Sequence, residues 1–580
     1  MKAITLQLCF LAILFSTFLT RRAPATDAPP ISHWFVDSLV KVFPGDEVLR
    51  SQLAKPEFSG ARNSHVSVQW VLRSHQRVED ISVEVVGFGG GGGNAIAAEV
   101  RAVGYVVVSS NTYTTPPSEI LHPAPALFPD VLLEKFPITL DPDKTQAVWI
   151  TLSVPSGAKP GDYHGQLVLR VGGVEKARDA FALRVAAATV PAQQTLKVTN
   201  WFYLSDRQLR SQYDVQQLTE DWWTVLGNIG RVMAEHRQNM ISTPLTGFYF
   251  CKLALIGAHA GPNGLEYDFT NFDRWVGTFQ RAGLIGSIEG AHVLRREENP
   301  DDPAHLKVDV YVLEDGKVAL KALPADDPRA EAGLRPMLMA LRQHLQEKGW
   351  LGIYYQHILD EVGEKEMPVY QRYAAIVHGS MPGIRTMDAV DAGRNLDIYE
   401  ESCDVWVPVL GSFDNLVPRL HQHVKNGGEV WFYTCGFCPT DKYANRFIDN
   451  SLIKTRLMQW FNFRYDLPGF LHWGGNYWSP NPVLDTQPLL GESWETAIFP
   501  SGDGFIVYPD KEHKSILSSI RLEAMRESIE DYELLRVLEN KDPNAAQALA
   551  ERAIRGFTDY VRDPAEFRKI HGELLEDLSE

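Results

Sequence analysis

Hydrophobic and polar positions follow two different patterns in the two parts of this chain. From about residue 31 to residue 190, short runs rich in valine, isoleucine and aromatic residues are separated by turn residues, as in segments 65–72, 147–154 and 166–171. Prolines and glycines stand between these runs, for example in segment 155–162. Short strands with such turns are typical of two packed antiparallel sheets. The pattern predicts an N-terminal β-sandwich domain over residues 27–192.

After residue 191, strand-like runs alternate with helical segments. Leu334, Met337, Leu338, Leu341 and Leu345 repeat at the spacing of one helix face. The runs that read as strands cover residues 196–203, 240–245, 284–293, 352–360, 384–390, 404–410, 429–435 and 469–474. Eight is the strand number of a (β/α)8 barrel. We predict a TIM-type barrel over residues 193–541, and an open doubly wound sheet is the alternative that fits the same alternation.

The chain of 580 residues is long enough to need more than one hydrophobic core. Leu522, Met525, Ile529 and Leu535 line one face of a helix, which we take as the last helix of the barrel. Residues 542–580 are charged and helical in pattern, and we expect them to pack outside the barrel as a C-terminal tail. The predicted fold class is therefore multidomain, β followed by α/β.

The N-terminus has the pattern of an export signal. Lys2 precedes an apolar run over residues 3–19, and Arg21, Arg22 and a stretch of small residues follow it. This order predicts a secretory signal peptide over residues 1–26, with an uncleaved membrane anchor as the alternative. No other segment approaches the ~20 apolar residues that a membrane helix needs. We expect a secreted or periplasmic protein without integral membrane association after cleavage.

Charge and cysteine content exclude several functions. The 56 basic and 73 acidic residues leave a net charge of -17, which repels nucleic acid and anionic lipid. Four cysteines, Cys251, Cys403, Cys435 and Cys438, remain after the signal peptide, too few for a disulfide framework in so long a chain. The CxxC of residues 435–438 has no second CxxC, so we expect a local disulfide or two thiols rather than a zinc or redox site. We predict no metal and no cofactor.

Residues 87–92 formally match the GxGxxG pattern after a strand-like run. The helix that we expect over residues 95–102 is too short for a crossover between parallel strands, and no acidic residue follows about 20 positions later. We therefore interpret the glycines as a loop of the sandwich and not as a dinucleotide site.

The sharpest chemical signal is the adjacent pair Asp360 and Glu361 at the end of the fourth predicted strand. Barrel enzymes keep their catalytic groups at the C-terminal ends of the strands. Hydrolysis of a glycoside requires a proton on the leaving oxygen and stabilisation of a positive anomeric carbon. Two neighbouring carboxylates can supply both, although a solvated loop or a salt bridge is the more common explanation of an acidic pair that stands alone.

Further polar and aromatic residues stand at other predicted strand ends, which favours the catalytic interpretation. We expect them to bind substrate, and they are Glu289, His292, His357, Asp388, Tyr433, Trp473, Asn476 and Trp478. For His357, inside a predicted strand, a hydrogen-bonded core histidine is the alternative. For Trp473 and Trp478 the alternative is also the core, but Gly474 and Gly475 suggest a loop that leaves the indoles available.

With these residues the chain resembles glycoside hydrolase family 123, a family of N-acetyl-β-galactosaminidases. The resemblance extends over nearly the whole chain after the signal peptide. The matching segments are 61–63, 68–69, 159–165, 267–269, 272–274, 289–292, 357–361, 473–478, 519–523 and 531–533. Together these segments are specific, whereas none is specific alone.

The resemblance implies a retaining exo-hydrolase that releases β-linked N-acetylgalactosamine from a glycan or glycoconjugate. In such enzymes the acetamido oxygen of the sugar attacks the anomeric carbon, so no protein nucleophile and no metal is needed. Asp360 would orient the acetamido group, and Glu361 would act as general acid and then as general base. An acid beside a carboxylate has a raised pKa and can hold a proton near neutral pH. Tyr433 would be a second partner of the acetamido group.

The chain departs from the family pattern at Val362-Gly363, where a proline is expected, and at Ser64, where a glutamate is usual. The first departure bears on the loop that positions Glu361. Two other hypotheses remain open. One is a conventional hydrolase with a protein nucleophile such as Glu289 and another sugar specificity, and the other is a non-catalytic carbohydrate-binding barrel.

Overall fold

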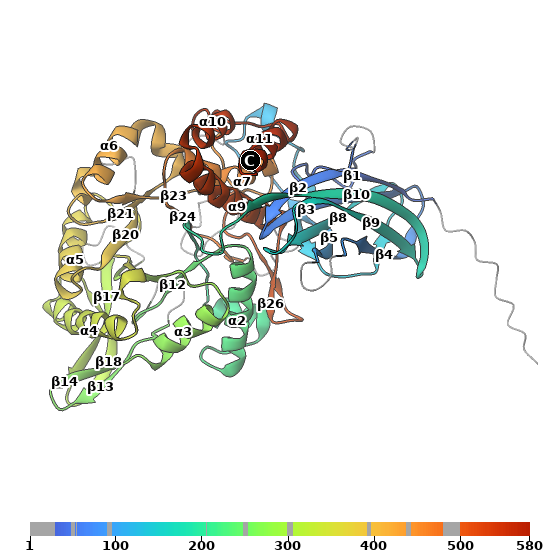
Figure 1. The fold of residues 1–580 in the computed structure, drawn as a ribbon. Coiled ribbons are helices and arrows are strands. Elements are labelled where there is room, and N and C mark those ends of the chain that lie inside the picture. Colours follow the sequence, from blue (N-terminus) through green and yellow to red (C-terminus); the bar gives the residue numbers. More distant parts are fainter. Residues whose placement is uncertain are drawn as a thin grey trace, which may run out of the picture.

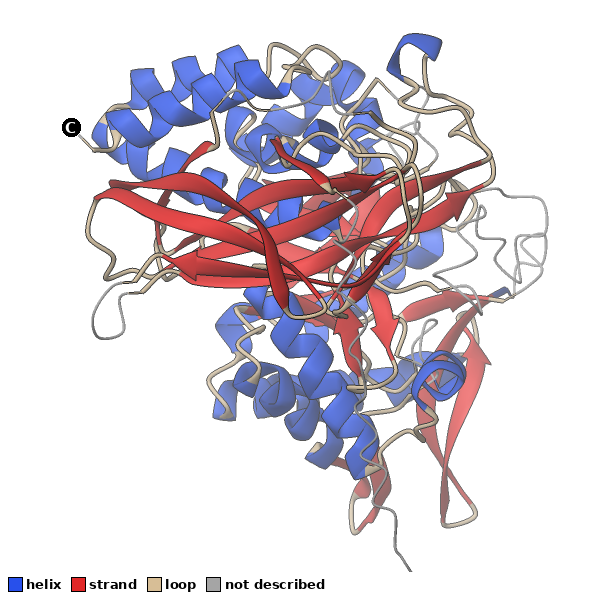
Figure 2. Cartoon of the chain, turned by 90° about the vertical axis from the view of Figure 1, so that its right-hand side faces the viewer, coloured by secondary structure: helices blue, strands red, loops and turns tan. Residues whose placement is uncertain are grey.

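The computed structural model describes residues 30–579 apart from 48–52, 54, 90–94, 205, 248–252, 298–304, 391–395, 437–441 and 479–498. The N-terminal part is a sandwich of two five-stranded sheets (Figure 1, Figure 2). One sheet has the order β1 (Ser32–Val36), β3 (Ser64–Ser74), β8 (Lys144–Val154), β5 (Ala97–Val108), β6 (Ala126–Leu133). The other has the order β2 (Glu57–Arg62), β10 (Val174–Thr189), β9 (Gly161–Val171), β4 (Val78–Gly87), β7 (Ile138–Leu140). The predicted β-sandwich is confirmed.

The sandwich corrects one local prediction. Residues 95–102 were expected to begin a helix, but Ala97–Val108 form strand β5, which pairs antiparallel with β8 and β6. Alanine and glutamate in this segment favour a helix by themselves, but the pairing of β5 between two strands outweighs that local preference. The glycine run thus precedes a strand, which removes the helix that a dinucleotide site would need.

Eight parallel strands follow the sandwich and close into a barrel. Their bounds are β11 (Lys197–Asn200), β12 (Met240–Thr243), β15 (Ser287–Gly290), β19 (Tyr354–Gln356), β20 (Arg385–Val390), β21 (Val405–Pro408), β22 (Glu429–Val430) with β23 (Phe432–Tyr433), and β24 (Gly469–His472). The sheet begins with β22 and ends with β23, which are the two halves of the seventh strand on either side of Trp431. β22 pairs with β21 and β23 pairs with β24, so the seventh strand joins the two edges. The predicted barrel is confirmed, and the open sheet is wrong.

Helices surround the barrel, and two β insertions extend its rim. The helices are α1 (Asp206–Tyr213), α2 (Glu220–Glu235), α3 (Thr270–Arg281), α4 (Pro328–Glu347), α5 (Met367–Ser380), α6 (Phe413–Lys425), α7 (Leu452–Arg456), α8 (Met458–Arg464) and α9 (Ile520–Lys541). The insertions are the hairpin β13 (Gly257–Gly261) and β14 (Gly264–Asp268), and the sheet β16 (Leu294–Arg296), β17 (Leu306–Glu314) and β18 (Lys317–Pro324). The second insertion follows β15 directly and therefore begins at the C-terminal end of a barrel strand.

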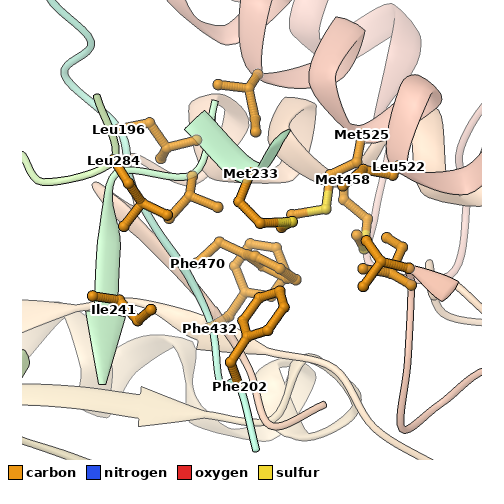
Figure 3. Packing of buried hydrophobic residues seen from close by; sticks show 14 of the residues in the cluster. Leu196, Phe202, Met233, Ile241, Leu284, Phe432, Met458, Phe470, Leu522 and Met525 are labelled. Atoms are coloured by element: carbon orange, nitrogen blue, oxygen red, sulfur yellow. The ribbon is translucent and has the colours of Figure 1, made fainter. Parts of the chain in front are cut away.

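Helix α9 lies between the barrel and the sandwich (Figure 1). Its apolar side packs on the barrel helices, where Leu522 and Met525 lie beside Met458 of α8 and Met233 of α2 (Figure 3). Its opposite side is also buried, although it carries charged residues. The predicted apolar face is therefore only one of two buried faces, because the sandwich covers the other.

Two further helices, α10 (Pro543–Ala553) and α11 (Pro564–Asp577), follow α9. Arg568 of α11 forms an ion pair with Asp37 of the sandwich, with 3.0 Å between Nε and Oδ2. The short strands β25 (Tyr508–Asp510) and β26 (Ser515–Leu517) form a hairpin before α9. In the part of the chain that the structure describes, none of the helices has the length and apolar character to span a bilayer. The predicted signal peptide lies outside the described residues.

Candidate active site

The acidic pair lies beyond a strand that is shorter than predicted. Strand β19 ends at Gln356, and the segment from His357 to Asp360 continues as a loop at the C-terminal end of the barrel. Beyond Gln356 the backbone carbonyls bond the segment that leads into the insertion and no longer a barrel strand. Val293 N donates to the carbonyl of His357 over 3.1 Å, and Leu294 N donates to the carbonyl of Ile358 over 2.9 Å. Asp360 and Glu361 thus stand on a loop that the neighbouring strand and the β insertion hold together.

Glu361 is exposed at the barrel opening and has a left-handed backbone with a φ of 41°. Its N–H donates to the carbonyl of Ala389 over 3.1 Å, and its own carbonyl accepts from Nη2 of Arg296 over 3.2 Å. The hydroxyl of Tyr433, at the end of the seventh strand, donates to its carboxylate. The predicted residues Glu361 and Tyr433 are therefore brought into contact.

Asp360 lies deeper than Glu361 and is only partly exposed. Burial, followed by the negative charge of Glu361, raises the pKa of Asp360 to about 7 against the opposing charge of Arg296. Two coupled carboxyl groups titrate as a pair. The pair thus carries a proton close to neutral pH, which is the condition for general acid catalysis.

Beneath the pair, three of the predicted residues bind one another in the barrel interior. His357 bonds Oε1 of Glu289 over 2.9 Å through Nε2 and Oδ1 of Asp388 over 3.0 Å through Nδ1. Burial alone lowers the pKa of His357, but the hydrogen bonds that its ring donates to Asp388 and Glu289 raise it to about 9. The ring is therefore an imidazolium that donates to both carboxylates. His357 thus has the geometry of a hydrogen-bonded core histidine, the alternative named for it above, and both of its ring nitrogens donate within the protein.

The two carboxylates of this cluster have further buried donors. Glu289 accepts from Nε1 of Trp201 and from Oγ1 of Thr199, each over 2.6 Å. Asp388 accepts from the N–H of Ile358 over 3.1 Å and from the hydroxyl of Tyr370 over 2.9 Å. The cluster consequently fixes the backbone that leads from β19 to Asp360.

His292, His357 and Asp388 form the group in the described residues whose ligand atoms lie near enough to hold a metal ion, within 4.8 Å of one another. Nε2 of His292 lies 3.7 Å from Oδ1 of Asp388. A metal needs the lone pair of a neutral imidazole. The protonated His357 uses both nitrogens as donors, so these residues fit a hydrogen-bonded cluster better than a metal centre.

The eighth strand places its predicted residues at different depths. Trp473 is partly exposed, lies 5.0 Å from the ring of Phe499 and packs against the barrel interior that includes Tyr433. Trp478 is 5% exposed and donates through Nε1 to the carbonyl of Val507 over 2.8 Å. The structure therefore puts Trp473 at the rim and Trp478 in the core.

Asn476 is fully buried and ties the eighth strand to the first. Its Oδ1 accepts from the N–H of Tyr203 over 2.6 Å, and its Nδ2 donates to the carbonyl of Tyr203 over 3.2 Å. Both ends of the amide are thus used within the protein. Cys435, at the end of the seventh strand, is buried, and its CxxC partner Cys438 lies outside the described residues.

The sequence interpretation missed Arg296, Trp201 and Asp503. Arg296 stands four residues after His292, beyond a strand end, and a basic residue there was a usable signal. Trp201 follows the first strand and was included in it rather than treated as a site residue. Asp503 accepts a hydrogen bond from the N–H of Gly436 over 2.9 Å, and no local pattern connects residues 67 positions apart.

Comparison with known proteins identifies the family of the chain. The family model described as glycoside hydrolase 123, catalytic domain, matches residues 201–538, and the model of the glycoside hydrolase 123 N-terminal domain matches residues 46–171. The first match covers more than half of the chain and contains every predicted site residue. No curated protein shows significant sequence similarity to the chain.

Solved structures give a second comparison. A family 123 glycoside hydrolase from Clostridium perfringens shares 16% sequence identity at a TM-score of 0.71, over 95% of this chain and 97% of that chain. A family 39 glycoside hydrolase from Bacteroides cellulosilyticus shares 9% identity at a TM-score of 0.35, over 82% of each chain. The first likeness concerns the fold, and the second is too weak to carry an argument. By the family models, the chain is a hydrolase of glycosidic bonds and belongs to glycoside hydrolase family 123.

Proposed function

We propose that this enzyme is a retaining exo-hydrolase that releases β-linked N-acetylgalactosamine with the help of the acetamido group of its substrate. The observation that carries the proposal is the adjacent pair at the barrel opening, in which Glu361 is exposed and Asp360 has a pKa raised to about 7. The pair holds a proton and a negative charge at one place. These are the two requirements of glycoside cleavage.

In the free enzyme the proton of the pair lies on Asp360, and the binding of substrate transfers it to Glu361 as the acetamido N–H comes to donate to Asp360. Glu361 donates this proton to the leaving oxygen while the acetamido oxygen attacks the anomeric carbon. Asp360 accepts a hydrogen bond from the acetamido N–H and stabilises the positive cyclic intermediate. Glu361 then takes a proton from water, which opens the ring with overall retention. Tyr433 donates to Glu361 in the structure, and we propose that its hydroxyl turns to the acetamido group when substrate binds.

The surroundings of Glu289 speak against it as a conventional nucleophile. Its carboxylate is fully buried and accepts hydrogen bonds from Trp201 and Thr199 besides its contact with His357. A nucleophile must approach the anomeric carbon at van der Waals distance. We propose instead that Glu289, His357 and Asp388 hold the loop of the catalytic pair from below.

For the substrate we propose a glycan of a glycoconjugate, with the terminal sugar bound between the pair and Trp473. The structure from Clostridium perfringens is described in terms of glycolipid glycan hydrolysis, which supports this class. An aromatic ring at the rim suits the apolar face of a sugar. The His292 ring, beside Trp201 at 5.4 Å, would border the same space.

The test compares two chromogenic substrates that differ only at the second carbon of the sugar. Nitrophenyl β-N-acetylgalactosaminide should be hydrolysed, and nitrophenyl β-galactoside should not, because the galactoside lacks the attacking oxygen. Comparable rates on both substrates would support the conventional hydrolase. Binding of the sugar without turnover of either would support the non-catalytic barrel.

A further inference from the structure

Arg296 lies at the end of β16, in the insertion and outside the barrel sheet, yet it contacts the loop of the catalytic pair. Its Nη2 donates to the backbone carbonyl of Glu361 over 3.2 Å. Its guanidinium charge also acts on both Asp360 and Glu361. We infer that Arg296 is the positioning residue of the general acid, an inference that rests on the proposed role of Glu361.

The backbone of Glu361 needs such support. A φ of 41° is left-handed, and a residue with a side chain rarely adopts it unless its surroundings impose it. Here the peptide groups on both sides of Glu361 are held, one by the carbonyl of Ala389 and the other by Arg296. Removal of either bond frees the backbone to relax and moves the carboxylate.

Glu366 holds Arg296 in place. Nε and Nη2 of Arg296 each lie 2.7 Å from a carboxylate oxygen of Glu366, which is a two-pronged ion pair. Glu366 also accepts from Nε2 of His305 over 2.8 Å and from the N–H of Gly363 over 2.6 Å. Arg296 and Glu366 therefore clamp the loop 360–366 at both of its ends.

The clamp uses the N–H of Gly363, one of the two residues at which the chain departs from the family pattern after the acidic pair. A proline at position 363 could not donate the hydrogen bond that the N–H of Gly363 makes to Glu366. In this chain the loop is fixed by that bond and by Arg296, where a proline would otherwise restrict the backbone. The insertion β16–β18 is thus part of the active site.

The adjacent residue Arg295 offers a matched control. It lies on the same strand and pairs with Asp309 of β17, with 3.0 Å between Nε and Oδ2. Its loss removes an arginine ion pair of the insertion without touching the catalytic loop. The loss of kcat in Arg296→Gln that exceeds the loss in Arg295→Gln then measures the contribution of the contact between Arg296 and Glu361.

The experiment measures kcat and KM of Arg296→Gln, Arg296→Lys and Arg295→Gln on two aryl β-N-acetylgalactosaminides. A phenyl leaving group needs the proton of the general acid, whereas a dinitrophenyl leaving group does not. We expect Arg296→Gln to lower kcat by ~30-fold on the phenyl substrate and by at most ~3-fold on the dinitrophenyl substrate, with little change in KM. Arg296→Lys keeps the positive charge but cannot form the two-pronged ion pair with Glu366. Its loss of kcat on the phenyl substrate should therefore be smaller than that of Arg296→Gln. Arg295→Gln should follow the wild type on both substrates.

Equal losses on both leaving groups would overturn the inference, because a merely structural defect does not depend on the leaving group. An equal effect of Arg295→Gln would overturn it as well. Glu361→Gln measured in parallel separates this inference from the proposed function. If Glu361→Gln hydrolyses the phenyl substrate like the wild type, the proposed general acid is wrong. If it shows the leaving-group dependence and Arg296→Gln does not, only the role of Arg296 is wrong.

Discussion

At the scale of single residues, exposure to solvent distinguishes Asp360 from Glu361, the two carboxylates that we propose as catalytic. Asp360 is the more buried, and its pKa is raised to about 7, while Glu361 reaches the solvent at the barrel opening. A buried carboxylate has few water molecules to stabilise its charge, so it gains more from a substrate group that donates to it. This difference suits Asp360 for holding the acetamido N–H and Glu361 for exchanging protons with water.

Asp360→Asn should therefore lower kcat on N-acetyl substrates by about 100-fold, because the amide no longer stabilises the positive intermediate. A thiazoline analogue of that intermediate should inhibit the wild type strongly and the variant weakly, since transition-state-like ligands gain most from catalytic groups. Inhibition constants and kcat of the two proteins test this. A fluorosugar that labels a protein carboxylate in the wild type, located by peptide mapping, would contradict the scheme.

The sequence predicted which other residues lie near the barrel opening better than it predicted how deeply they are buried. Glu289 and Asp388 were predicted at strand ends and His357 inside a strand, and the structure brings the three side chains together. Their burial depends on hydrogen bonds between residues 31 and 68 positions apart in the chain. Local patterns do not contain such pairings, so the sequence could not show that these side chains bind one another.

At the scale of elements, the end of the eighth strand carries two tryptophans with different surroundings. Trp473 packs between Phe499 and Tyr203 and stays partly exposed. Trp478 is buried near Tyr213, with 6.2 Å between the ring centroids. The same loop thus supplies one ring to the rim and one to the core.

Alanine replacements should separate these two roles. Trp473→Ala should raise KM by ~10-fold while the melting temperature changes little, because the lost contact is with the sugar. Trp478→Ala should destabilise the protein by ~3–5 kcal/mol, as large buried aromatic residues do. Steady-state kinetics and denaturant unfolding of both variants test the assignment. If Trp478→Ala folds with the stability of the wild type but has a raised KM, Trp478 binds substrate and the assignment to the core is wrong.

The barrel strands could be predicted because each is a short apolar run, and because helices of clear period such as α4 separate several of them. The two β insertions were not predicted, although β17 alternates apolar and polar residues from Leu306 to Val310 and buries every second one. The expected order of one strand and one helix left no place for an antiparallel sheet between two barrel strands. Strand β5 was mistaken for a helix since its alanines allow both structures. In both cases pairing with other strands determined the secondary structure, and the local preferences of the residues do not reveal such pairing.

At the scale of the whole molecule, α9 joins the sandwich to the barrel through buried charges. Arg521 pairs with Asp130 over 2.8 Å, and Glu523 pairs with Arg101 over 2.8 Å, both across the domain boundary. Oε1 of Glu530 lies 2.7 Å from Nδ1 of His65, again in the sandwich. Buried ion pairs contribute most to specificity, because a missing partner leaves an unpaired charge in the interior.

Glu530→Gln should therefore destabilise the protein by about 3 kcal/mol at neutral pH. Burial raises the pKa of Glu530, but its interactions with His65, Arg237 and Arg526 outweigh burial and lower it overall. Burial also lowers the pKa of His65, so at neutral pH the charged partners of Glu530 are the two arginines. A carboxyl group whose pKa is lower in the folded than in the unfolded protein stabilises the fold fully above the unfolded pKa, which is about 4.3 for glutamate. This stabilisation is lost as the pH falls through the folded pKa. The difference between wild type and variant should accordingly shrink below about pH 4.

Denaturant unfolding at a series of pH values measures this difference. Glu539→Gln, on the same helix but half-exposed beside Arg536, is the control and should change the stability by less than about 0.5 kcal/mol at any pH. A constant difference for Glu530→Gln down to pH 3 would show that its carboxylate is not the stabilising group.

The charged face of α9 also bears on how such a protein can evolve. Recombination between genes exchanges domains freely when the surface left behind is soluble. Here a barrel inherited without its sandwich would expose Arg521 and Glu523 without Asp130 and Arg101, and a sandwich inherited alone would lose the helix that covers it. The N-terminal domain is therefore not an exchangeable binding module, and the two domains should be inherited, lost and diversified as one unit.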